Sequence, residues 1–107
     1  MADVKVLAES LVSLTVKQVQ ELSEFLKENP AVKIAIHGHT DNVGKPEENL
    51  KLSEDRAKMV FDLLVLDGTN SSRLNYKGFG ARKPVATNLT EKGKALNRRT
   101  EFVVTSK

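Results

Sequence analysis

The chain has 107 residues, a formal net charge of +3 and no cysteine. Its length fits one domain spanning residues 1–107, and 39% hydrophobic with 29% charged residues is a globular composition. The lack of cysteine excludes disulfides and cysteine-ligated zinc, and no run approaches the ~18 apolar residues of a membrane span. Met1-Ala2-Asp3 does not open a signal peptide, so we expect a cytoplasmic protein or one whose targeting segment has been removed.

The hydrophobic pattern predicts alternating strands and helices. Residues 4–8 are a candidate first strand, and 15–28 carry apolar residues at helical spacing with Thr15 as N-cap and Pro30 as the stop. Residues 32–37 alternate between apolar and other residues, as a strand with one buried face does. Further on, the pattern predicts a polar loop at 38–46, a helix at 47–66, a strand at 73–79, a short helix at 90–96 and a last strand at 98–105.

This order predicts a two-layer α/β sandwich with the helices packed against one sheet. The strands joined through the helices at 15–28 and 47–66 are expected to be parallel neighbours.

Two histidines stand close to an aspartate after the predicted strand at 32–37. His37, His39 and Asp41 have the H-x-H-x-D spacing that opens the metal motif of a family of zinc hydrolases. Asn42 replaces the next histidine of that motif, and the chain has no third histidine. Because a catalytic zinc usually has three protein ligands, we predict no metal site. We expect His37 at the strand edge and His39 hydrogen-bonded within the loop.

No other catalytic template stands out. The chain lacks a cysteine nucleophile, a G-x-S-x-G serine and a G-K-[ST] phosphate loop. A paired-carboxylate glycosidase stays open as an alternative, although no pair is singled out. We therefore predict no catalytic residues, no cofactor and no enzymatic activity.

The loop at 38–46 and the helix after it can form a polar ligand site. Asp41 follows a buried strand, where ligands commonly bind in strand–loop–helix units. Asn49 stands near the start of the next helix, and Arg56 further along it. A carboxylate and a guanidinium suit a zwitterionic ligand. The alternative is that Asp41 and Arg56 pair with each other, and spacing alone favours this alternative.

Six motifs resemble one family. They are "GHTDNVG" at 38–44, "NLKLSEDRA" at 49–57, "GFG" at 78–80, "PVATN" at 84–88, "TEKGK" at 90–94 and "NRRTE" at 97–101. In this order and spacing, over residues 32–105, they resemble the OmpA-like C-terminal domain of outer-membrane protein A, peptidoglycan-associated lipoprotein and the flagellar stator subunit. Residues 4–14 match the family poorly.

The resemblance implies an α+β fold of βαβαβ type with a mixed sheet and helices on one face. It implies non-covalent binding of the peptidoglycan stem peptide, with Asp41 and Arg56 holding diaminopimelate. Diaminopimelate carries an ammonium and a carboxylate on its side chain, and is thus the kind of zwitterion considered above. Asn49 maps to the same groove, and Thr40 could offer its hydroxyl or backbone there.

The adjacent arginines of "NRR" are expected to differ in role. Neighbouring strand residues point to opposite faces, so Arg98 or Arg99 could reach the groove while the other faces solvent or pairs with an acid. We choose Arg98 as the groove residue, with a structural role for both as the alternative. Gly78, Gly80 and Gly93 are expected to meet conformational needs of the backbone.

The resemblance also implies a place in the cell. It predicts a periplasmic domain that is itself outside the membrane and tethered to the outer membrane by a segment not included here. The competing function is a basic βαβ module that binds nucleic acid. Against it, no predicted strand carries the interleaved aromatic and basic residues of a base-stacking surface, so we expect no nucleic-acid partner.

Overall fold

The computed structural model describes residues 16–107. Within that range the elements are α2 (Val16–Glu28), β1 (Lys33–His39), α3 (Pro46–Leu66), a 3-10 turn (Ser71–Arg73), β2 (Leu74–Gly78), α4 (Glu91–Asn97) and β3 (Arg99–Ser106). The helices and strands predicted for this range are therefore confirmed, with ends shifted by one or two residues. The predicted strand at 4–8, and with it the crossover through the first helix, lies outside the described residues.

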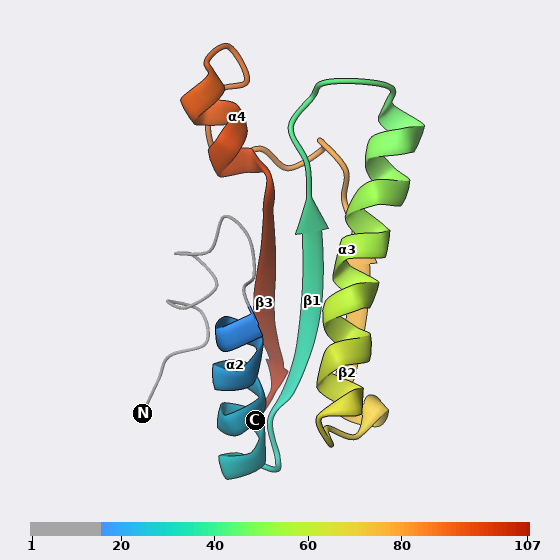
Figure 1. Ribbon diagram of the computed structural model, residues 1–107, viewed down its shortest axis with the longest axis vertical. Helices are drawn as coiled ribbons and strands as arrows, with labels where there is room; N and C mark the ends of the chain where they lie inside the picture. The colour runs from blue at the N-terminus through green and yellow to red at the C-terminus, as the bar shows by residue number, and fades with distance from the viewer. Residues whose placement is uncertain (1–15) are drawn as a thin grey trace.

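The three described strands form a mixed sheet in the order β2-β1-β3 (Figure 1). The central strand β1 pairs in parallel with β2 and antiparallel with β3. The helix α3 joins β1 to β2, so these two strands are the parallel neighbours that the sequence predicts. The predicted α+β class with a mixed sheet is confirmed.

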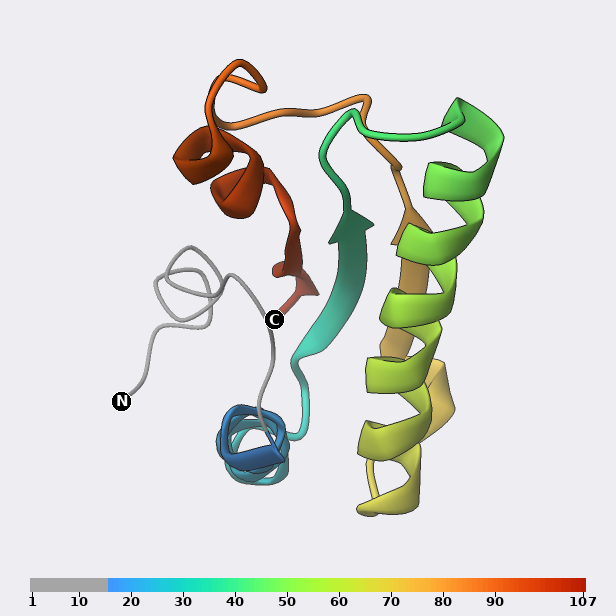
Figure 2. The ribbon, with the colours of Figure 1, turned by 45° about the horizontal axis from the view of Figure 1, so that its top comes forward.

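The core lies between one face of the sheet and the helices α2 and α3. In Figure 2, α3 runs alongside β1 and β2, while α2 is seen nearly end-on near the start of β1. Apolar side chains from all these elements form one buried cluster: Val19, Leu22, Leu26, Ile34, Ile36, Ala57, Val60, Leu64, Leu74 and Phe102. Since each fully buried leucine or isoleucine contributes about 1.5–3 kcal/mol, this cluster fixes both helices on the same face of the sheet.

The strand β1 is longer than the sequence pattern indicates. We predicted that it ends at His37, but Gly38 and His39 continue it, paired with Thr100 and Arg99 of β3. The expected loop start at Gly38 is thus wrong. Pairing on both sides of a central strand outweighs the low strand propensity of one glycine.

Two glycines allow α3 to lie directly on the sheet. A Cβ atom on Gly38 would stand 2.1 Å from the carbonyl oxygen of Ser53, and one on Gly78 would stand 2.4 Å from the amide nitrogen of Glu54. Gly38 and Gly78 are paired neighbours in β1 and β2. Glycine is needed at Gly78 because a side chain would collide with α3, not because of a special backbone dihedral angle. Gly80, in contrast, has a φ of +58°, a left-handed conformation that favours glycine.

Arg73 fastens the end of α2 to the sheet. Its Nη2 donates hydrogen bonds to the carbonyl oxygens of Leu26 and Asn29, both at 2.8 Å, and its Nε donates to that of Val32 at 3.0 Å. These carbonyl groups lie at the end of α2 and in the turn before β1, where the helix supplies no partners. None of the helices within residues 16–107 has the length and apolar character to span a membrane.

We expect Arg73→Ala to lower the free energy of unfolding by about 2–4 kcal/mol, because three hydrogen bonds from a charged donor are lost. The carbonyl group of Asn29 keeps the amide of Val32 as a partner. Urea unfolding followed by circular dichroism measures this change. Arg82→Ala is the matched control, since Arg82 is exposed and bonds only Phe79 three residues before it. Equal stability of the two variants would contradict the role given to Arg73.

Candidate functional site

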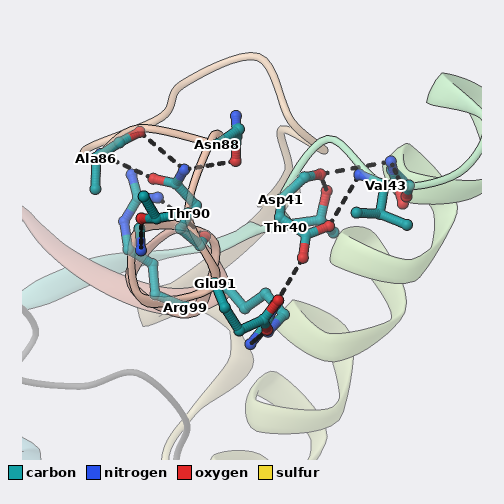
Figure 3. Close-up of polar contacts among 12 residues, drawn as sticks. Thr40, Asp41, Val43, Ala86, Asn88, Thr90, Glu91 and Arg99 are labelled. Carbon is teal, nitrogen blue, oxygen red and sulfur yellow. Dashed lines mark hydrogen bonds and ion pairs between the residues drawn. The ribbon is translucent and has the colours of Figure 1, made fainter.

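Thr40 and Asp41 lie directly after β1, at the carboxyl end of the central strand. The amide of Thr40 donates to the carbonyl oxygen of Gly80 at 2.9 Å, and its hydroxyl donates to the carbonyl oxygen of Asp41 at 2.8 Å. The carboxylate of Asp41 accepts from the amide of Val43 at 3.0 Å (Figure 3). These bonds fix the backbone and the side chain of Asp41 before any ligand arrives.

Arg98 is the ion-pair partner of Asp41. Its Nη1 lies 2.7 Å from Asp41 Oδ2, and its Nη2 lies 3.3 Å from Oε1 of Glu91, which approaches from the start of α4 (Figure 3). The alternative in which Asp41 pairs with Arg56 is therefore wrong for this structure. Arg98 stands between α4 and β3, and joins the loop after β1 to α4.

The environment of Asp41 keeps its carboxylate ionised. Burial alone would raise its pKa, but the hydrogen bonds from Arg98 and from the amide of Val43 outweigh burial, so that the pKa is lowered from its ordinary value. The side chain is mostly buried, with 12% of its surface exposed. Asp41 is thus a fixed negative charge beside the end of the sheet.

Arg56 is exposed and, among residues 16–107, has no hydrogen-bond or ion-pair partner. Seven residues make nearly two helical turns, so Arg56 lies on the same side of α3 as Asn49 before it and Leu63 after it. Leu63 lines a hollow together with Val19 and Gln20 of α2. Arg56 therefore lies on the flank of α3 that faces the α2 side of the sheet.

The direction of helical side chains brings Arg56 towards the loop. Side chains on a helix lean towards its N-terminus, and in α3 the N-terminus is the end that carries Asn49. Asn49 is buried, and its Nδ2 donates to the carbonyl oxygens of Val43 at 3.0 Å and Asp41 at 3.5 Å. Asn49 thus supports the loop of Asp41, on the side of α3 that also carries Arg56.

Asn97 organises the segment before α4, a role that sequence reasoning missed. This fully buried side chain accepts from the amides of Val85 and Ala86, and donates to the carbonyl oxygen of Ala86 and to the side chain of Asn88 (Figure 3). The signal was present, because Asn97 opens the "NRR" motif.

Gly93 lies in the same region, and a Cβ there would stand 1.9 Å from the carbonyl oxygen of Thr87. Space, not dihedral freedom, explains this glycine.

Arg99, the second arginine of the "NRR" motif, has different partners from Arg98, as expected for neighbouring residues at the start of a strand. Arg99 is buried, and its Nε donates to Glu101 Oε1 at 2.6 Å, while its terminal nitrogens donate to the carbonyl oxygens of Asn97 and Lys83. One arginine therefore holds Asp41, and the other holds an acid on β3.

The histidines lie on the sheet face turned away from α2 and α3. His39 is 1% exposed, stacks on the ring of Phe79 at 5.2 Å, and has no hydrogen bond at either ring nitrogen. The expected hydrogen bond of His39 within the loop is therefore wrong. His37 lies edge-on to the same ring at 4.8 Å. Continuation of β1 through Gly38 places His39 on the same face of the sheet as His37. Within the described range, no three His, Asp or Glu side chains are grouped so as to hold a metal ion.

Burial and the nearby Arg99 lower the pKa of His39 from 6.5 to about 4, against the opposing effect of Glu101. His39 is thus neutral at pH 7. Glu101 Oε2 lies 3.5 Å from His39 Nε2, so a charged imidazole would gain only one partner while losing its hydration.

Comparison with known proteins gives one consistent family. The model of the OmpA family matches residues 11–98. The chain is 44% identical to outer membrane porin F of Pseudomonas fluorescens over 86 residues, which are 80% of this chain and 26% of the porin. It is 38% identical to the peptidoglycan-binding protein ArfA of Mycobacterium tuberculosis over 95 residues, which are 89% of this chain and 29% of ArfA. The chain thus spans about a quarter of the length of these relatives.

Among solved structures, the chain is similar to the crystal structure of the peptidoglycan-associated lipoprotein from Burkholderia pseudomallei. The TM-score is 0.80 at 32% sequence identity, and the match covers 90% of this chain and 84% of that one.

We expect Arg98→Ala to raise the pKa of Asp41, because burial is then opposed by only the amide of Val43 and the charge of Lys94. An NMR titration of the Asp41 carboxyl carbon measures the change. Glu91→Gln is the control, since it removes the other partner of Arg98 but keeps the ion pair with Asp41. The same pKa of Asp41 in Arg98→Ala and in the parent chain would show that the ion pair is absent in solution.

Because the pKa of His39 is lowered in the folded chain, we expect the folded state to lose stability in weak acid. Its pKa is lower in the folded chain than in the unfolded chain, so its contribution is complete above pH 6.5 and is lost as the pH falls towards 4. Between pH 7.5 and pH 5 this loss amounts to about 2 kcal/mol, measurable by urea unfolding at several pH values. In His39→Phe, which keeps a ring against Phe79 but does not titrate, we expect a flatter dependence. An unchanged slope would refute the assignment.

Proposed function

Because the chain belongs to the OmpA family, we propose that it forms one OmpA-like domain, residues 1–107, that binds peptidoglycan non-covalently through the diaminopimelate of the stem peptide. Asp41 binds the ammonium of that residue and Arg56 its carboxylate. Thr40, Asn49 and Arg98 line the rest of the groove. The domain acts as an anchor and not as an enzyme.

The charge arrangement around Asp41 supports this proposal. Asp41 is ionised and fixed by protein groups, and a carboxylate has about four acceptor positions for hydrogen bonds, of which Val43 and Arg98 use two. Positions therefore remain for a ligand ammonium. Arg56 has no partner within residues 16–107, so its guanidinium can take a carboxylate in a bidentate manner without breaking an existing pair.

The names of the relatives support the choice of ligand and of compartment. ArfA is described as peptidoglycan-binding, and the similar crystal structure is that of a peptidoglycan-associated lipoprotein. The porin relative is an outer membrane protein. This similarity supports our proposal of a periplasmic domain that is tethered to the outer membrane.

The test is an NMR titration of the protein with meso-diaminopimelate and with a stem peptide that contains it. We expect amide shifts in residues 38–57 and a dissociation constant between about a micromolar and a millimolar, because a small polar ligand on an open groove buries few contacts. Asp41→Asn keeps the shape of the side chain and an acceptor for Val43 while removing the charge. Arg56→Gln shortens and neutralises the other contact.

Each of these variants should weaken binding roughly 10- to 100-fold, the value of a charge-assisted hydrogen bond. Lys51→Gln is the matched control, since it removes one positive charge from an exposed position about 140° around the axis of α3 from Arg56 and should bind like the parent chain. If Asp41→Asn and Arg56→Gln also bind like the parent, the site is assigned to the wrong residues.

A further inference from the structure

A second cavity lies on the other side of Asn49 from Arg56. It has a volume of about 520 Å³, a size typical of small-ligand sites. Pro46 and Leu50 of α3 form one wall, and Phe79 and Ala81 of the segment after β2 form the other. Polar groups of Asn42, Glu47 and Arg82 also line it. The cavity thus has apolar walls together with one acidic side chain, Glu47, and one basic side chain, Arg82.

The cavity and the site of Asp41 share the same loop. Asn42 lines the cavity and directly follows Asp41 in the chain. Asn49 also lines it, while its Nδ2 donates to the carbonyl oxygens of Asp41 and Val43. A ligand held at Asp41 therefore needs to extend only past this loop to enter the cavity.

We infer that this cavity binds the peptide residues that adjoin diaminopimelate, with a carboxylate of the peptide on Arg82. The inference rests on the proposed function and extends it from one residue of the stem peptide to several. Apolar walls suit the short side chains and the backbone of such residues, whereas Arg82 supplies the charge that a peptide carboxylate requires.

The guanidinium of Arg82 is positioned for this role. Its Nε donates to the carbonyl oxygen of Phe79 at 3.2 Å, which holds the side chain at the cavity. In the described part of the chain no acidic side chain is paired with Arg82, and Glu47, on the facing wall, forms no ion pair either. Both charges thus remain free for ligand groups of opposite sign.

The state of Phe79 favours a peptide over a sugar as the occupant. A sugar ring would stack on a free aromatic face, but the Phe79 ring already stacks on His39, and the ammonium of Lys83 lies 4.4 Å from its centroid. Protein groups therefore occupy the faces of the ring. Phe79 therefore offers no free ring face on which a sugar in the cavity could stack.

The experiment compares two probes, free meso-diaminopimelate and a stem peptide that contains it, by isothermal titration calorimetry. The parent chain should bind the stem peptide about tenfold more tightly, since the free amino acid cannot reach the cavity. Arg82→Gln should remove most of that gain and leave the affinity for free diaminopimelate within about twofold. Lys83→Gln is the matched control, because it removes the same charge from the next residue, which does not line the cavity.

The outcomes separate the two proposals. If the parent chain binds neither probe, the proposed function fails and this inference fails with it. If the parent chain binds both probes but Arg82→Gln behaves like Lys83→Gln, the inference alone is wrong. A peptide-free glycan fragment whose binding depends on Arg82 would also overturn it, by making the cavity a sugar site.

Discussion

The close contact between α3 and the ends of β1 and β2 determines where every candidate site group lies. Gly38 and Gly78 leave room for the backbone of α3 at Ser53, which is fully buried. The Ser53 hydroxyl donates to the carbonyl oxygen of Leu50 and accepts from the amide of Gly80. One turn of the helix is thus fixed to both strands where they end, and the loops that leave those strands begin from a rigid base.

This contact gives a small domain a fixed support for the polar groups of the candidate site. Asp41 lies two residues after the end of β1, and Asn49 lies in the first turn of α3. Short segments therefore connect both residues to the contact of Ser53 with Gly38 and Gly78. The network from Asp41 through Arg98 to Glu91 then joins α4 to the loop. Since Glu91 is exposed and Arg98 partly exposed, the network contributes little to stability. Its effect is to hold the Asp41 carboxylate charged and in one orientation.

Sequence patterns predicted the elements well because each has its own periodicity, and the family resemblance assigned Asp41, Asn49 and Arg98 to one groove. Other features depend on tertiary contacts. The end of β1 could not be predicted, because pairing with β2 and β3 carries the strand through Gly38. The partner of Asp41 is 57 residues away in Arg98, a distance at which spacing carries no information. The lack of a hydrogen bond at His39 likewise depends on a tertiary contact, because its ring stacks on Phe79 from the segment after β2.

A ligand ammonium need not displace Arg98 from Asp41, and this bears on the strength of binding. Displacement would break a 2.7 Å ion pair for another of the same kind, with no net gain. Addition at the free lone pairs places the ammonium near the guanidinium, and Glu91, as the second acid on Arg98, offsets part of the repulsion between the two cations. Weak affinity for one zwitterion follows from either route. An anchor of the proposed kind would gain strength from many copies along a polymer, since linked weak sites hold together far more tightly than one site alone.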